Sequence, residues 1–140
     1  MIRWLREWLG KRSLPEHLRR GRLGEAAARR TLRQAGFKIL TANYRGGRGE
    51  LDLVCRDQEC LVFVEVKARS SEEWGRAAAA VDKEKRRLVA EAALVYLRRL
   101  GNPKVRFRFD VVEVLLKDGA VREVRHLPNA FELPKPLIYC

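Results

Sequence analysis

Three charged residues interrupt the most apolar part of the sequence, GELDLVCRDQECLVFVEVKAR at residues 49–69. Asp52, Glu65 and Lys67 stand among Leu, Val and Phe residues, where an unpaired charge is costly to bury. Two carboxylates and an amine that share a pocket can hold a divalent cation and orient a water molecule beside it. These three residues are therefore the first candidates for chemistry.

Strand geometry brings the three residues together. Side chains alternate between the faces of a strand, so Glu65 and Lys67 share one face. If the segments 50–56 and 60–68 pair as a hairpin around the polar turn between them, Asp52 lies directly opposite Glu65. Both acids and the lysine then meet in one patch at the ends of the two strands.

Two carboxylates at that distance repel each other strongly at low dielectric. Protonation of one acid, an ion pair with Lys67, or a divalent cation would relieve the repulsion. Mg²⁺ or Mn²⁺ suits Asp52, Glu65, the backbone carbonyl of Val66 and several waters. Lys67 would then align an attacking water or stabilise charge on a phosphate. The alternative is a simple ion pair between Lys67 and one acid, and the spacing alone does not decide between the two.

The composition predicts one globular domain and favours an anionic partner. The 140 residues are 46% hydrophobic and 34% charged, with a formal net charge of +12. Residues 1–48 hold thirteen Lys or Arg against three Asp or Glu, whereas the remaining residues are nearly balanced. Such an imbalance is typical of nucleic-acid binding, although arginine-rich composition and anionic lipid are alternatives.

No apolar run approaches the length of a transmembrane helix, and the opening residues do not resemble a signal peptide. The expected location is therefore the cytoplasm. Residues 1–13 form a basic amphipathic pattern containing Trp4 and Trp8, and residues 134–140 are expected to be an irregular tail. Residues 14–133 are expected to form the single domain.

The segments that must position the charged residues predict a mixed α/β sheet. Helical patterns cover residues 15–35 and about 81–100, each ended by a glycine. Strand patterns cover residues 37–41, 50–56, 60–68, 105–116 and 121–127. The strand–helix–strand crossover predicts a parallel pair within a sheet of about five strands flanked by two helices. The glycine-rich loop ANYRGGRG is expected to be mobile, and the chain beyond Pro128 irregular.

Longer stretches of sequence carry a family resemblance. The segments LGEAAARRTLRQAGFKILTANYR, GELDLV, LVFVEVKAR, RFDVV and HLPNAF resemble the YraN-like family of bacterial proteins. The match extends from Leu23 to Phe131. Asp52 followed by Glu65-Val66-Lys67 on paired strands is similar to the motif of the PD-(D/E)XK nuclease superfamily. This sequence has Leu51 where that motif often has proline.

The resemblance implies a restriction-endonuclease-like core and metal-dependent cleavage of phosphodiester bonds. By analogy, Asp52 and Glu65 would be metal ligands and Lys67 the catalytic lysine. Glu25 matches a first-helix glutamate that completes the acidic cluster in related junction-resolving nucleases, although an exposed pair with Arg29 explains it equally on local grounds.

Further positions would contact the substrate. Lys85, on the second helix, would reach a phosphate, and Arg45 and Arg48 would clamp the backbone. Other arginines would extend the binding track: Arg29, Arg30, Arg86 and Arg87. Asp110 also matches the family and is a weaker candidate, the alternative being that it only pairs with Arg106 or Arg108.

The sequence thus predicts a metal-dependent nuclease acting on DNA or RNA. Selectivity for nucleic-acid structure is favoured over sequence, because nothing indicates base readout. One alternative is a nucleic-acid-binding protein without catalysis on the same fold. Another is an interaction protein that docks through Trp4 and Trp8. A homodimer is compatible with all three hypotheses.

Overall fold

The computed structural model describes residues 15–70 and 83–133. The predicted amphipathic segment at residues 1–13 and the predicted tail at residues 134–140 lie outside these ranges.

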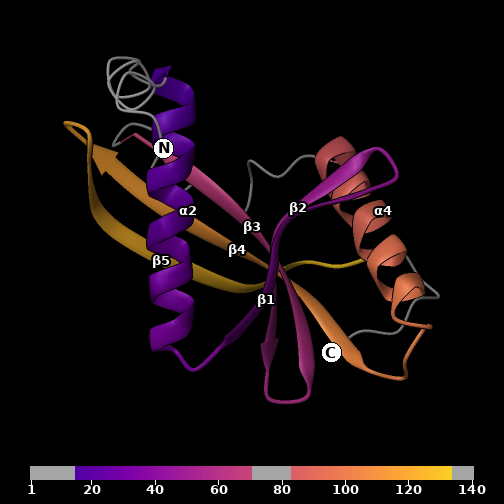
Figure 1. Cartoon of the computed structure of the whole chain (residues 1–140). Coiled ribbons are helices and arrows are strands. Elements are labelled where there is room, and N and C mark those ends of the chain that lie inside the picture. The colour runs from indigo at the N-terminus through magenta and orange to yellow at the C-terminus, as the bar shows by residue number, and fades with distance from the viewer. Residues whose placement is uncertain (1–14, 71–82, 134–140) are drawn as a thin grey trace, which may run out of the picture.

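Five strands form one mixed sheet with a helix on each face (Figure 1). The elements in chain order are α2 (Glu16–Gln34), β1 (Lys38–Gly46), β2 (Gly49–Asp57), β3 (Cys60–Arg69), α4 (Lys83–Arg99), β4 (Arg106–Lys117) and β5 (Ala120–Phe131). The strands are arranged in the order β1-β2-β3-β4-β5. Only β3 and β4 are parallel, and the other neighbouring pairs are antiparallel. The predicted α/β fold, including its parallel crossover, is confirmed.

Both helices end as the sequence predicts. Gly36 follows α2 with a φ of +91°, a value that favours glycine. The N–H of Phe37 donates to the carbonyl of Leu32, and that of Gly36 donates to Arg33, which is a Schellman motif. Gly101 ends α4 in the same way. In the described parts of the chain, no helix has the length and apolar character needed to cross a membrane.

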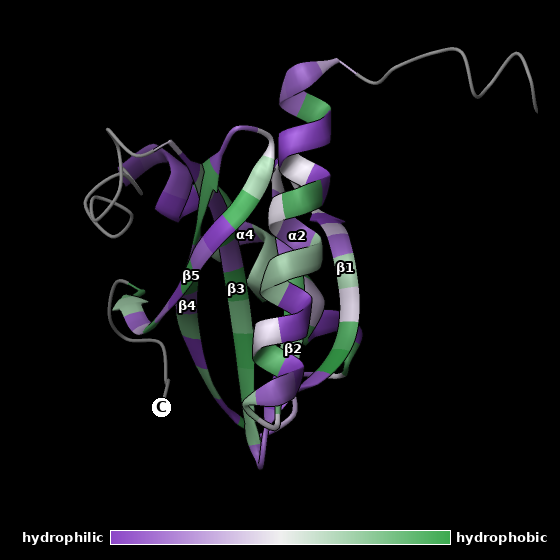
Figure 2. Cartoon of the chain, turned by 90° about the vertical axis from the view of Figure 1, so that its left-hand side faces the viewer, coloured by the Kyte–Doolittle hydropathy of each residue, from purple (hydrophilic) through white to green (hydrophobic). Residues whose placement is uncertain are grey.

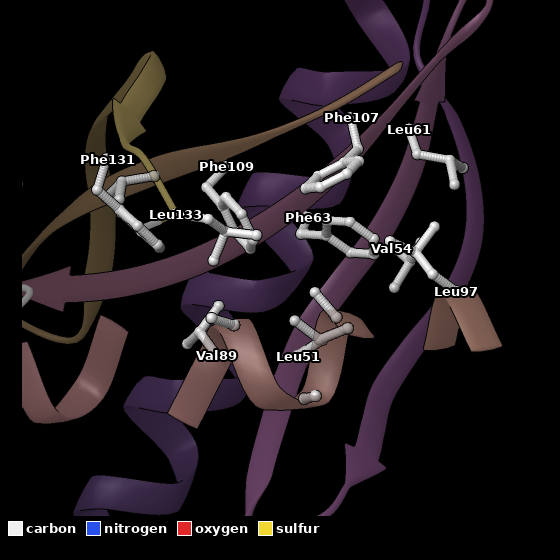
Figure 3. Packing of buried hydrophobic residues seen from close by; sticks show 14 residues of the cluster. Leu51, Val54, Leu61, Phe63, Val89, Leu97, Phe107, Phe109, Phe131 and Leu133 are labelled. Atoms are coloured by element: carbon white, nitrogen blue, oxygen red, sulfur yellow. The ribbon is translucent and has the colours of Figure 1, made fainter. Parts of the chain in front are cut away.

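Each face of the sheet has its own hydrophobic core. On one face, Ala28 and Leu32 of α2 pack against Val62 and Val64 of β3. Figure 2 shows α2 lying along that face, with its N-terminal end reaching past the strands. On the other face, α4 covers a cluster of aromatic rings centred on Phe63 (Figure 3). Two buried layers therefore hold β3 between them.

The glycine-rich loop is not the mobile connection that its composition predicts. β1 and β2 continue as a tight hairpin through Gly46 and Gly49, and both of these glycines are buried. A Cβ at Gly49 would overlap the backbone carbonyl of Leu88 in α4, and one at Gly46 would lie 2.9 Å from Cβ of Val95. These glycines permit close packing of the hairpin against the helix rather than movement.

The last strand is longer than predicted and continues through Pro128 to Phe131. Proline is tolerated there because β5 lies at the edge of the sheet. Asn129 adopts a φ of +49°, and the register shifts between Phe109 and Val111 of β4. This irregularity resembles a β-bulge, and the chain pairs again beyond it.

The packing of Gly49 against α4 predicts a selective effect of adding one methyl group. Gly49→Ala should lower the free energy of unfolding by about 2–3 kcal/mol, because α4 must move away from the hairpin. Gly21→Ala is the matched control, since a Cβ there meets nothing within 4 Å and alanine favours the helix by about 1 kcal/mol. Urea denaturation of both variants measures the difference. Equal stabilities would show that the hairpin does not press on the helix.

Candidate active site

Asp52 lies where β2 separates from β3. The ladder between the two strands ends at Leu53↔Val64. Beyond that pair, Leu51 joins the core under α4, whereas Leu53 belongs to the core under α2. Strict alternation would put both leucines on one face, so the chain changes face at Asp52. There the Asp52 carboxylate accepts a 2.7 Å hydrogen bond from the backbone N–H of Val66.

Glu65 is the buried centre of the charged group. Its side chain is only 3% exposed, and its Oε1 lies 3.3 Å from Nζ of Lys67 and 3.3 Å from Nζ of Lys85. Its Oε2 is buried, and no N–H group of residues 15–70 and 83–133 donates to it. Burial lowers the pKa of Lys85, but the charge and hydrogen bond of Glu65 outweigh this effect and the pKa is raised. Two ammonium groups therefore approach the same oxygen of Glu65.

Asp52 holds a proton under conditions in which an exposed aspartate is ionised. Burial, followed by the negative charge of Glu65, raises the pKa of Asp52 to about 7. The hydrogen bond from Val66 opposes this rise without cancelling it. The two acids thus lie close enough for the charge on one to disfavour the charge on the other.

Glu25 lines the same cleft as Asp52 but is held by other partners. The cleft has a volume of about 290 Å³ and lies between α2 and the sheet, with Glu25, Asp52 and Val66 in its wall. Glu25 accepts a 3.0 Å hydrogen bond from Arg29 and a 3.4 Å hydrogen bond from the Asn43 amide. Across residues 15–70 and 83–133, no three His, Cys, Asp or Glu side chains gather closely enough to hold a metal ion. Glu25 therefore lies near Asp52 and Glu65, which are called the acid pair below, but does not form a metal-binding cluster with them.

The arginines predicted to contact nucleic acid are spread over three surfaces. Arg45 and Arg48 are exposed on the β1–β2 hairpin. The side chain of Arg45 lies 4.0 Å from that of Glu50, and the side chain of Arg48 lies 3.8 Å from that of Glu91. On α2, Arg30 is exposed, one residue beyond the Arg29 that holds Glu25. On α4, Arg87 pairs with Glu84, and Arg86 lies over the ring of Phe131. Only Lys85, among the predicted basic contacts outside the motif, touches the acid pair.

Asp110 is part of a separate polar network. It is fully buried and accepts hydrogen bonds from Arg108 at 3.0 Å and from the N–H of Asn129 at 3.1 Å, with His126 at 2.7 Å. Burial raises the pKa of Asp110, but the hydrogen bonds outweigh this effect and the pKa is lowered. The structure thus shows the pair with Arg108 that the sequence offered as the alternative explanation for Asp110.

Sequence reasoning missed Glu113 of β4, which is buried like Glu65 and Asp110. Glu113 is fully buried and lies beside Lys67 in the ladder between β3 and β4. An acid inside the apolar run VVEVLL is the same signal that drew attention to Glu65. Four further residues of α2 that line the cleft with Asp52 were also missed: His17, Leu18, Gly21 and Arg22.

The sheet with its two flanking helices has the element order that the resemblance implies. Residues 24–114 match the Uncharacterised protein family UPF0102, and the chain belongs to this family.

Several UPF0102 proteins are similar to the chain over most of their length. The protein from Anaeromyxobacter dehalogenans is 47% identical over 112 residues, which cover 80% of this chain and 83% of the relative. The protein from Desulfosudis oleivorans is 44% identical over 112 residues, covering 80% and 89%. That from Pelotomaculum thermopropionicum is 43% identical over 112 residues, covering 79% and 93%. The predicted YraN-like membership is confirmed.

The raised pKa of Asp52 predicts an unusual dependence of stability on pH. The folded protein keeps this proton up to about pH 7, whereas an unfolded chain releases it near 3.8. Folding therefore takes up a proton between these values, and in EDTA the Asp52 contribution to the free energy of unfolding falls as pH rises from about 4 to about 7. Asp52→Asn should remove this fall and stabilise the protein at pH 8 by about 2–4 kcal/mol.

Urea unfolding between pH 4 and pH 8 measures this effect. Asp118→Asn, in the exposed turn after β4, is the control and should leave the profile unchanged. An Asp52→Asn protein that is less stable than the wild type at every pH would contradict the prediction.

Asp110 should show the opposite dependence on pH. Because its pKa is lowered in the folded state, its stabilising contribution is present above about pH 4 and is lost as pH falls below that value. At pH 7, Asp110→Asn should cost about 3–5 kcal/mol, since it leaves Arg108 and His126 without their buried acceptor. Asp57→Asn removes only the outer contact to Arg108 and should cost about 1 kcal/mol or less. Thermal unfolding that ranks the two variants equally would refute this assignment.

Proposed function

We propose that this protein is a metal-dependent nuclease that hydrolyses phosphodiester bonds of DNA or RNA and selects its substrate by structure. The acid pair carries this proposal. Asp52 and Glu65 come from neighbouring strands into one buried site, and Lys67 contacts the carboxylate of Glu65.

The donor set of the acid pair fits a hard divalent cation. Two carboxylates and nearby backbone oxygens are the ligands that Mg²⁺ and Mn²⁺ prefer. Burial, mutual repulsion and the hydrogen bond that a protonated Asp52 makes with Glu65 all make the pair costly when both acids are ionised. Asp52, Glu65 and the carbonyl of Val66 would hold the ion, with Glu25 at the border of the cleft. When bound, the ion supplies positive charge to the phosphate and makes a coordinated water more acidic.

The other groups act on the phosphate and on the water. Lys67 lies beside the acid pair, where its ammonium would hydrogen-bond a phosphate oxygen as water attacks phosphorus and the P–O bond breaks. Lys85 contacts the carboxylate of Glu65, and its ammonium group would balance part of the negative charge of the phosphate. Arg45 and Arg48 project from a hairpin that packs against α4, and they would bind the nucleic-acid backbone farther from the acid pair.

A binding protein without catalysis is the second candidate, and one observation favours it. Glu65 already has two lysines at 3.3 Å, so its charge is balanced without an added ion. Titration calorimetry with Mg²⁺ separates the candidates, because the nuclease must bind the ion and the binding protein need not. The Asp52→Asn variant should lose the heat of binding if the acid pair is the site.

Cleavage assays test the nuclease directly. With Mg²⁺ or Mn²⁺, the wild type should cut at least one of four DNA substrates: single-stranded, duplex, flap and branched. Lys67→Ala should slow cleavage by about 10²–10⁴-fold while leaving the circular dichroism spectrum unchanged. Lys117→Ala, at an exposed position on β4, should cut at the wild-type rate. A wild-type protein inert on all four substrates and on single-stranded RNA would refute the proposal.

A further inference from the structure

A continuous groove runs along α2 beyond the acid pair. The cleft that contains Asp52 adjoins a second cleft of about 330 Å³, because Arg22 and Glu25 line both. The first extends toward His17, and the second ends at Arg29 and Asn43. These two clefts together are the α2 groove. The helix forms one side of it, and the strands form the other.

The α2 groove places basic side chains beside its acidic residues. Arg22 is exposed at the junction of the two clefts, and His17 is exposed at the far end. The negative charge of Glu25 is offset by Arg29 at 3.0 Å and by the Asn43 amide. A phosphate chain in the groove would therefore meet Arg22 close to Asp52.

Gly21 leaves space within the α2 groove. It lines the first cleft, and a Cβ built on it meets no atom within 4 Å. Glycine inside a helix costs about 1 kcal/mol relative to alanine, so the packing of α2 does not account for it. By contrast, a Cβ on Gly24 would lie 3.4 Å from Cβ of Ala68, which shows that the helix sits close against β3 one turn later. The groove is therefore open at Gly21 and bounded by close packing beyond it.

We infer that the α2 groove binds one unpaired polynucleotide strand and leads it to Asp52. This inference rests on the proposed function and names the form of its substrate. Each cleft is close in volume to a small-molecule site, which suits a nucleotide unit rather than a duplex. Proteins that bind single strands use grooves that contain basic side chains to follow the backbone.

The residues that line the groove also indicate which part of the nucleic acid the protein recognises. Among the described residues that line the two clefts there is no Phe, Tyr or Trp on which a base would stack. Affinity must then come mainly from phosphate contacts, with weak preference for base sequence and strong dependence on salt. DNA and RNA strands share this backbone chemistry.

Fluorescence anisotropy in EDTA measures strand binding without cleavage. The probes are a short labelled DNA oligonucleotide, the RNA of the same sequence and the blunt DNA duplex. At least one single strand should bind about tenfold more tightly than the duplex, and the tighter of the two identifies the natural backbone. A duplex that binds as tightly as both single strands, or a protein that binds none of the probes, overturns the inference.

Substitutions in α2 locate the bound strand. Gly21→Trp should weaken single-strand binding about tenfold by filling the groove, whereas Gly21→Ala should bind as the wild type does. Arg22→Ala should weaken binding about threefold to tenfold and reduce the slope of log K against log salt by about 0.7. Arg98→Ala, in the last turn of α4 on the opposite face, is the control for charge and should bind normally.

The results separate this inference from the proposed function. If Gly21→Trp and Arg22→Ala both bind the single strand as tightly as the wild type does, the inference about the groove is overturned, even if the protein cuts nucleic acid with Mg²⁺. Conversely, strand binding that both variants weaken would support the groove even if no substrate is cut, and the nuclease proposal alone would fail. Circular dichroism of each variant confirms that α2 is still folded.

Discussion

The hydrogen bond from the Val66 N–H to Asp52 fixes the geometry on which the candidate site depends. A backbone N–H on a central strand must find an acceptor. Where β2 leaves β3, no backbone partner continues the ladder, and the Asp52 carboxylate takes that place. The acid is thereby held over β3, close to Glu65, although burial and repulsion both act against its negative charge. One bond therefore links the end of a strand pair to the electrostatics of the site.

The two faces of the sheet contribute different parts of the site. The α4 face supplies Lys85, which reaches the carboxylate of Glu65, and the α2 face supplies the cleft through which Asp52 is approached. The change of face between Leu51 and Leu53 makes this division possible, because it leaves Asp52 between the two layers. Asp52 is thus accessible from the first helix, while the counter-charges of Glu65 come from the second helix and from β3.

The strand pattern predicted the fold class, and the register of the hairpin predicted the approach of Asp52 to Glu65. Strict alternation fails at Asp52, however, because the chain changes face between Leu51 and Leu53. The hairpin was mispredicted because glycine is compatible with either mobility or close packing, and only the position of α4 distinguishes them. The extension of β5 past Pro128 depends on its place at the sheet edge, which periodicity does not contain. The groove at Arg22 arises from the packing of α2 on β3, a tertiary relation with no signature in spacing.

The glycine hairpin affects the cost of binding at the candidate site. A flexible loop that carries arginines loses conformational entropy when it orders around a ligand. Here Glu91 accepts a hydrogen bond from the Arg48 N–H, and the neighbouring glycines abut α4, so the backbone beneath Arg45 and Arg48 is already ordered. Only the two side chains must lose freedom on contact with a phosphate. The hairpin is a preorganised platform and not a flap that closes over its ligand.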